Sequence, residues 1–237
     1  MATVVLNRPD TGNRIDSEMA SAIREVCRLI GEDDGLRLVV LTANGDVFSS
    51  CNPGQAGDDV ESLAVASAVA GLSIPVLAAV NGDATGPGLE LALAADLRIC
   101  VPAARFGFTG LAHGVLPQDG GTQRLPRLVG PAWARDMLLT GRLVDAQEAL
   151  AIGLVNRVVK EPTTLTAAVD ELAAQITSGG PIGARYAKEA VVKGMDLTLN
   201  QGLGLEADLN VILQSTSDRA DGIKSFLEKR GPEYSGS

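Results

Sequence analysis

Short apolar runs alternate with amphipathic stretches through the first half of the chain. The runs consist mainly of Val, Leu, Ile and Ala and have the length of strands: residues 3–7, 36–43, 74–80 and 97–101. The intervening stretches place apolar residues at helical spacing: residues 17–33, 58–72 and 88–96. Residues 36–43 are apolar almost without a break, which is typical of a strand covered on both faces. The alternation predicts an α/β core with a buried sheet.

The pattern becomes mostly helical from about residue 130 onward, with one more short strand predicted at 155–160. Strands that come first and helices that come last indicate a βα core followed by a helical region. The late helical run at 202–213 still carries many leucines and valines. Such a face either caps the core or forms an interface between copies of the chain. By contrast, the Gly, Asn, Ser and Pro content of residues 45–57 predicts a loop.

Composition excludes several classes of function. The chain has 237 residues, of which 46% are hydrophobic and 3% aromatic, and its net charge is −9. This acidic balance argues against binding to nucleic acid or to an anionic membrane surface. Pro75 and Gly82 interrupt the most apolar stretch, so no membrane span is expected. The N-terminal residues show no export signal, which favours a cytoplasmic protein.

The cysteines and the histidine do not form a recognisable metal or disulfide pattern. Cys27, Cys51 and Cys100 are odd in number, far apart and without a CxxC pair, which fits reduced thiols. His113 is the only histidine, so a histidine-based metal centre is not expected.

A glycine-rich turn at residues 82–90 carries the first candidate chemistry. Its glycines allow close backbone approach, and Pro87 suits the first turn of the helix that follows, although it has no N–H to donate. Glu90 lies in that first turn, where the helix dipole favours a carboxylate. A carboxylate beside a strand-to-helix turn suits acid/base chemistry, and a solvated helix-start glutamate is the alternative.

A second candidate lies in residues 106–130. There a Gly-Gly-Thr turn precedes a helical run and Asp119 stands just ahead of it. Asp119 could cap the helix or act as a catalytic carboxylate.

Six stretches, taken in order, resemble the crotonase superfamily, which is the enoyl-CoA hydratase/isomerase group. They are LNRPDTGNRI, VVLTANGDVFSS, PVLAAVNGDATGPGLELALAADLRI, GGTQRLPRLVG, LTGRLVDAQEALAIGLVNRVV and SFLEKRGPEY. The resemblance implies a crotonase-like spiral of ββα units over residues 1–180. It also implies a C-terminal helical trimerisation region over residues 181–237, and a homotrimer or a dimer of trimers. The substrate would be a coenzyme A thioester, with no separate cofactor and no metal.

The resemblance also implies two backbone N–H groups that stabilise an enolate oxygen. One donor position falls on Asn52, where Cys51 and Pro53 replace the glycine and aspartate that the family carries. The other falls on Pro87, which has no hydrogen to give. The N–H of Gly88 could substitute for it only if the turn shifts.

The resemblance also implies positions for the catalytic carboxylates and for contacts with the nucleotide end of coenzyme A. The first hydratase glutamate of the family falls on Glu90, whereas the second falls on Gly110, and Asp119 matches a position where some isomerases carry an aspartate. In family members, coenzyme A is gripped by the loop that contains Gln55. A neighbouring subunit adds contacts at the positions of Phe226 and Lys229.

Three functions follow from these residues. The first is a weak or atypical enoyl-CoA hydratase/isomerase that uses Glu90 and Asp119. The second is a non-catalytic acyl-CoA binder or assembly subunit, because Pro87, Gly110 and Pro53 all depart from the family at one site. The third is a thioester hydrolase that would use Cys51 and His113 as nucleophile and base.

Overall fold

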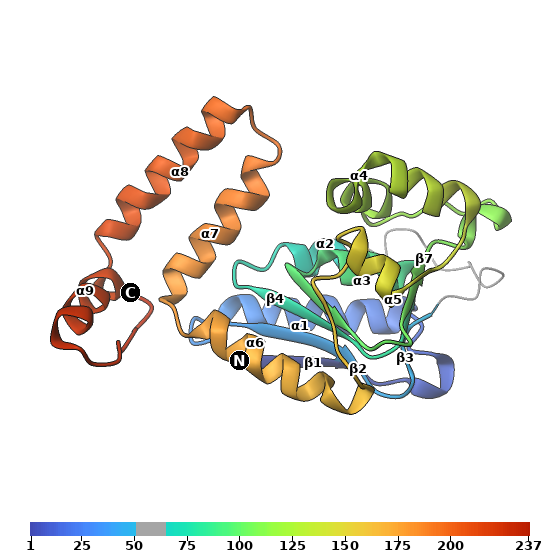
Figure 1. The fold of residues 1–237 in the computed structure, drawn as a ribbon, viewed down its shortest axis with the longest axis horizontal. Coiled ribbons are helices and arrows are strands. Elements are labelled where there is room, and N and C mark those ends of the chain that lie inside the picture. The colour runs from blue at the N-terminus through green and yellow to red at the C-terminus, as the bar shows by residue number, and fades with distance from the viewer. Residues whose placement is uncertain (51–64) are drawn as a thin grey trace.

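The larger of two sheets forms the centre of the molecule. A computed structural model describes residues 1–50 and 65–237 (Figure 1). The strand order is β1-β2-β4-β6-β9 and every neighbouring pair is parallel. Its strands are β1 (Ala2–Leu6), β2 (Val39–Ala43), β4 (Val76–Val80), β6 (Leu97–Cys100) and β9 (Arg157–Val158). The strands predicted from the apolar runs are therefore confirmed, and β4 is buried along its whole length as a sheet covered on both faces requires.

A second, smaller sheet is formed by short strands, three of which come directly after strands of the large sheet. Its order is β3-β5-β7-β8, parallel except for the antiparallel β7–β8 pair. Its strands are β3 (Val47–Ser49), β5 (Asp83–Thr85), β7 (Arg105–Gly107) and β8 (Val144–Asp145). The prediction of a loop over residues 45–57 is therefore wrong for residues 47–49, which form β3. Residues 51–57 of that predicted loop lie outside the described residues. Strands of this length are too short to produce an apolar run.

Three strands of the large sheet are each followed in sequence by a strand of the small one. β2 leads into β3, β4 into β5, and β6 into β7, and a helix follows each pair. Because parallel strands need a crossover connection, α2 and α3 return the chain to the start of β4 and of β6. The repeated ββα unit brings successive strand-to-helix turns to one region of the molecule.

Helices pack around the two sheets. They are α1 (Ser17–Glu32), α2 (Val65–Ala70), α3 (Pro87–Ala94), α4 (Gly121–Thr140), α5 (Ala146–Ala151) and α6 (Leu165–Thr177). α3 is the most enclosed, since every residue from Gly88 to Ala94 is buried, and it contacts both α2 and α4. A helix in this position has no free face, so any polar side chain on it must find partners inside the protein.

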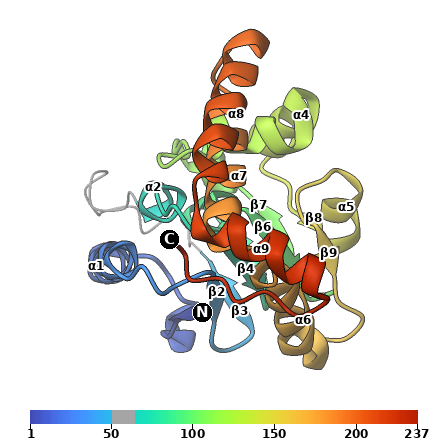
Figure 2. The ribbon, with the colours of Figure 1, turned by 90° about the vertical axis from the view of Figure 1, so that its left-hand side faces the viewer.

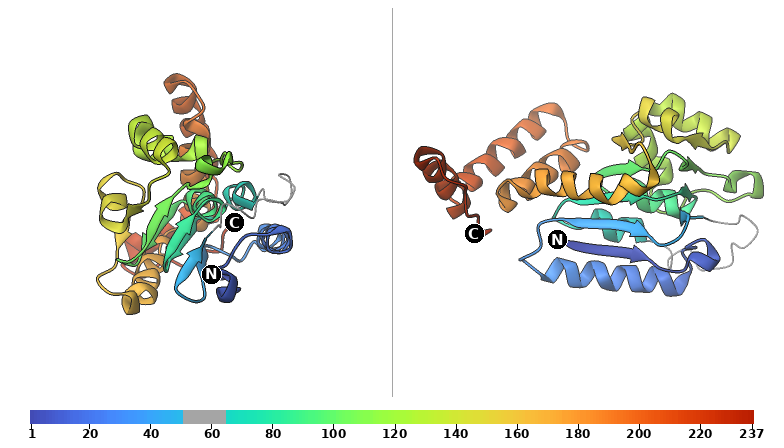
Figure 3. Two further views of the ribbon diagram at one scale, coloured as in Figure 1. Left: turned by 90° about the vertical axis from the view of Figure 1, so that its right-hand side faces the viewer. Right: turned by 60° about the horizontal axis from the view of Figure 1, so that its bottom comes forward.

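Three C-terminal helices project from the core, and Figures 1 and 3 show them at the opposite end from α4. They are α7 (Pro181–Gly194), α8 (Leu199–Gln214) and α9 (Ser217–Glu228). Figure 2 views the molecule from the side on which α9 lies. α7 is joined to the core through Lys188, whose Nζ donates to the carbonyl of Ile74 (3.0 Å) and pairs with Asp96 (2.8 Å).

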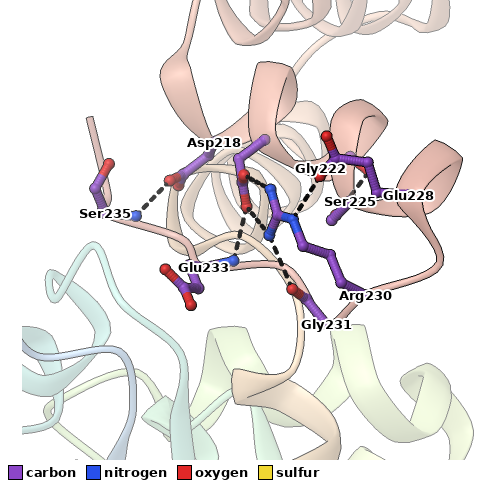
Figure 4. A network of polar contacts seen from close by, with 9 residues as sticks. Asp218, Gly222, Ser225, Glu228, Arg230, Gly231, Glu233 and Ser235 are labelled. Carbon is purple, nitrogen blue, oxygen red and sulfur yellow. Dashed lines mark hydrogen bonds and ion pairs between the residues drawn. The ribbon is translucent and has the colours of Figure 1, made fainter.

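The final residues fold back on α9 through a polar network (Figure 4). Oδ1 of Asp218 accepts hydrogen bonds from the N–H groups of Ser235 and Gly236, both at 2.9 Å. Arg230 pairs with Asp221 and with Glu228. This network fixes the tail against α9.

Among the residues described, no helix is both long and apolar enough to cross a membrane, and no group of three or more His, Cys, Asp or Glu side chains could hold a metal ion. Cys27 and Cys100 are buried free thiols, whereas Cys51 lies outside the described residues.

Candidate active site at the start of α3

The turn between β5 and α3 presents the first N–H groups of the helix. Gly86 is the N-cap, with φ 54° and ψ −126°, and its N–H donates to the carbonyl of Gly107 in β7 (3.0 Å). Pro87 is the first helical residue. The first intrahelical bond runs from the N–H of Glu90 to the carbonyl of Gly86 (3.1 Å). The N–H groups of Gly88 and Leu89 therefore have no carbonyl partner within α3.

Gly88 lies against the end of β3. A Cβ at this position would collide with the carbonyl oxygen and the side chain of Ser49. Only glycine allows the start of α3 to approach β3 so closely, and β3 leads directly to the predicted donor loop. Asn52 and Gln55, the residues predicted there, lie outside the described residues.

Glu90 is buried beside this turn, with only 3% of its surface exposed. The alternative of a solvated helix-start glutamate is therefore wrong. Oε1 accepts hydrogen bonds from the N–H groups of Asp119 (2.7 Å) and Gly121 (2.9 Å). Within residues 1–50 and 65–237, no hydrogen bond engages Oε2. The carboxyl group is thus anchored through one oxygen and leaves the other for a reacting group.

The surroundings of Glu90 favour its protonated form. Burial raises the pKa of the Glu90 carboxyl, because the charged form loses hydration, and the negative charge of Asp119 raises it further. The N–H groups of Gly121 and Asp119 and the charge of Arg124 oppose this shift without cancelling it. A carboxyl with a raised pKa binds a proton more strongly than an ordinary glutamate does, which suits a group that must both accept and return one.

Asp119 caps a helix, although not the helix that follows it in sequence. The N-cap of α4 is Gly120, which has no side chain to serve as a cap. The carboxylate of Asp119 instead accepts from the N–H of Ala66 (2.5 Å) and from the N–H (3.1 Å) and hydroxyl (2.5 Å) of Ser67. These donors lie at the start of α2. Asp119 is therefore close to Glu90, but its carboxylate is already engaged.

The other predicted site residues lie in the short 3-10 helix before α4 and in or directly after α9. Gly110 begins a short 3-10 helix (Gly110–His113), in which His113 is exposed. Phe226 is 83% exposed on α9, and Lys229 follows the same helix. Figures 1 and 3 place α9 at the opposite end from α4, so one chain does not bring these two residues to Glu90.

Sequence reasoning missed the groups that hold the two carboxylates. The N–H groups of Asp119 and Gly121 hold Glu90, and those of Ala66 and Ser67 hold Asp119. Arg124 fixes the same turn, because its Nη1 donates to the backbone carbonyl of Asp119. The Gly-Gly pair after Asp119 was the available signal, because a turn that needs glycine often exposes N–H groups.

The ββα units and the helical C-terminal region are those of a crotonase-like α/β protein. The family model for enoyl-CoA hydratase/isomerase matches residues 1–237, so the chain belongs to the enoyl-CoA hydratase/isomerase family. It is 40% identical to the putative enoyl-CoA hydratase/isomerase YngF of Bacillus subtilis, and the match covers 100% of this chain and 95% of that protein.

Two further comparisons agree with this assignment. The crotonyl-CoA hydratase of Syntrophomonas wolfei is 35% identical, over 99% of this chain and 94% of that protein. The crystal structure of an enoyl-CoA hydratase from Bacillus anthracis superposes with a TM-score of 0.94 at 36% identity, covering 99% of this chain and 95% of that one. These comparisons confirm the crotonase fold.

The raised pKa of Glu90 predicts how its replacement changes stability with pH. Below the ordinary glutamate pKa of 4.5 the carboxyl is protonated in both folded and unfolded chains, so the fold buries no charge. As the pH rises through the folded pKa, the fold must hold a buried carboxylate and loses stability. Glu90→Gln, which keeps an oxygen acceptor, avoids this loss. We expect the free energy of unfolding of the variant, relative to wild type, to increase as the pH rises above 4.5, until the Glu90 carboxyl is ionised in the folded chain as well.

Urea denaturation at several pH values measures this difference. If this difference stays constant or decreases over the same range, the pKa of Glu90 is not raised in the folded chain.

Proposed function

We propose that the chain acts on an acyl-CoA thioester as an enzyme of enoyl-CoA hydratase/isomerase type, with Glu90 as its acid/base. One observation carries the proposal: Glu90 is buried, Oε1 is anchored by two N–H groups, and Oε2 is left without a partner among the described residues. Relatives whose names include hydratase activity, such as the crotonyl-CoA hydratase of Syntrophomonas wolfei, support the substrate class.

Oε2 is the atom that moves the proton in this proposal. In a hydration, it takes a proton from water as the water oxygen adds to the β-carbon, and it delivers that proton to the α-carbon. In an isomerisation, it takes a proton from one carbon and returns it to another carbon of the same conjugated system. Both reactions place negative charge on the thioester oxygen, and N–H groups aimed at that oxygen lower the barrier.

This chain lacks one of the two backbone N–H groups that would stabilise the thioester oxygen, because proline occupies position 87. A backbone N–H at that position would lie in the first turn of α3, where no carbonyl of the helix competes for it. Loss of one such donor typically costs about 10²–10³-fold in rate. We therefore expect slow turnover, with Asn52 as a surviving donor and the N–H of Gly88 as the nearest substitute.

A non-catalytic acyl-CoA binder or assembly subunit is the second candidate. Two positions favour it: Pro87 lacks a donor hydrogen, and Gly110 lacks a side chain where the family places its second glutamate. This candidate predicts thioester binding without turnover.

The assembly that we propose is a homotrimer or a dimer of trimers. The C-terminal helices leave large apolar side chains in water, and such a face is typical of a surface between subunits. The most exposed are Val191 (68%), Leu199 (77%), Val211 (67%), Phe226 (83%) and Leu227 (74%). In such an assembly Phe226 and Lys229 of one chain would contact coenzyme A bound to another.

Glu90→Gln tests the central proposal. The variant keeps the anchoring hydrogen bonds but cannot exchange a proton, so turnover of crotonyl-CoA should fall by about 10²–10⁴-fold. The absorbance of the conjugated thioester follows the reaction. Glu171→Gln, an exposed change of the same kind on α6, should leave the rate unaltered.

Equal turnover by wild type and Glu90→Gln would refute the role of Glu90. Binding of crotonyl-CoA by calorimetry, with no turnover of it or of a β,γ-unsaturated thioester, would favour the binding candidate.

Pro87→Gly and Pro87→Ala both restore an N–H at the missing donor position. We expect both to raise turnover, by up to about 10²–10³-fold. Pro162→Ala, which changes a proline at the start of the short 3-10 helix Pro162–Thr164, should not alter it. If neither variant at position 87 accelerates the reaction, the missing hydrogen is not what limits it.

Val211→Asp tests the assembly, because it places a charge on the exposed apolar face of α8. The variant should sediment as a smaller species than wild type, whereas the neighbouring change Asn210→Asp should not. A wild-type chain that sediments as a monomer at micromolar concentration would exclude the proposed oligomer.

A further inference from the structure

Asp119 connects two elements that lie far apart in the sequence. Its backbone N–H anchors Oε1 of Glu90, while its carboxylate holds the start of α2. Both carboxylate oxygens are engaged: Oδ1 accepts from the N–H and the hydroxyl of Ser67, and Oδ2 accepts from the N–H groups of Ala66 and Ser67. Asp119 is 7% exposed, so these contacts are shielded from water.

The peptide of Asp119 is fixed on its other side as well. Nη1 of Arg124, one turn into α4, donates to the carbonyl oxygen of Asp119. The next N–H that reaches Glu90 belongs to Gly121. The turn at 119–121 therefore has its side chain, its carbonyl and two of its N–H groups all assigned to partners.

This arrangement argues against Asp119 as a second acid/base. A proton taken up by its carboxyl would occupy a lone pair that now accepts from α2, and the orphan N–H groups at the start of that helix would lose an acceptor. Oε2 of Glu90 has no such commitment among the described residues. Within the part of the chain that the structure describes, Glu90 therefore has a carboxyl oxygen that is free to exchange a proton, whereas both oxygens of Asp119 accept hydrogen bonds from α2.

α2 is the element that Asp119 places beside the site. Val65, Ala66 and Val69 are buried, and α2 contacts α3, which carries Glu90. An interior helix of this length has little stability of its own, so its position depends on packing and on its cap.

We propose that Asp119 is a positioning residue, which sets Glu90 through its own N–H and fixes α2 against α3 through its carboxylate. The proposal rests on the proposed function of Glu90. It assigns Asp119 no contact with the reacting atoms.

The experiment compares Asp119→Ala, Asp119→Asn and Ser67→Ala with wild type, and Asp170→Asn, an exposed change on α6, is the control. Three quantities are measured: amide hydrogen exchange at Ala66 and Ser67, the pKa of the Glu90 carboxyl by carbon NMR, and kcat and KM for crotonyl-CoA. Only the third requires that the enzyme be active.

In Asp119→Ala we expect exchange at Ala66 and Ser67 to accelerate by about tenfold or more, since bonds to a charged acceptor are lost. Asp119→Asn keeps one acceptor oxygen and Ser67→Ala removes one donor, so both should give smaller accelerations. In Asp119→Asn the pKa of Glu90 should fall, because the charge that raises it is gone. The acidic limb of the pH–rate profile should then move to lower pH, while kcat falls by less than about tenfold.

Two results would overturn the proposal. One is unchanged amide exchange at Ala66 and Ser67 in Asp119→Ala. The other is a loss of about 10²-fold or more in kcat in Asp119→Asn with exchange unaltered, which would make Asp119 an acid/base after all. If Asp119→Ala does not fold, the same measurements on Asp119→Asn and Ser67→Ala decide. If wild type shows no turnover, the proposed function fails, and the exchange and the Glu90 titration still test the positioning role.

Discussion

The site depends on holding the Glu90 carboxyl group inside the protein core, where none of the described residues forms an ion pair with it. Burying a carboxylate is costly, and the penalty is reduced only if hydrogen-bond donors replace water. Here the donors are two backbone N–H groups of one turn, which satisfy Oε1 of Glu90. Backbone donors leave part of the desolvation cost in place, so the pKa stays raised. α3, the turn at 119–121 and the cap of α2 are all arranged around this requirement.

The repeated ββα unit explains how such distant residues meet. Parallel strands of the large sheet end at the same edge, and the turns that follow β5 and β7 present N–H groups there. Glu90 comes from the helix after β5, while the donors that hold it come from the turn after β7. The fold therefore supplies the site from consecutive repeats, and the C-terminal helices take no part in it within one chain.

The large sheet could be predicted from the sequence, because β2 and β4 are continuous apolar runs whose only explanation is burial. The small sheet could not, since β3 and β5 are three-residue strands inside segments with loop composition. In the site, Glu90 and Asp119 were found from their place beside turns. The different hydrogen-bonding of the two carboxyl groups was not predictable, because it depends on which N–H groups each oxygen meets, and those groups lie 29 to 53 residues away in the sequence.

The packing of Gly88 has a consequence for how this site can change over time or in the laboratory. The turn is held on one side by Ser49, which leaves no room for a side chain at position 88, and on the other by the bond from Gly86 to Gly107. A shift of the turn that would bring another donor to the place of the missing one must break both contacts. One substitution at position 87 adds or removes a donor while its neighbours stay fixed. Replacement of that donor by the N–H of Gly88 instead requires the loss of both contacts.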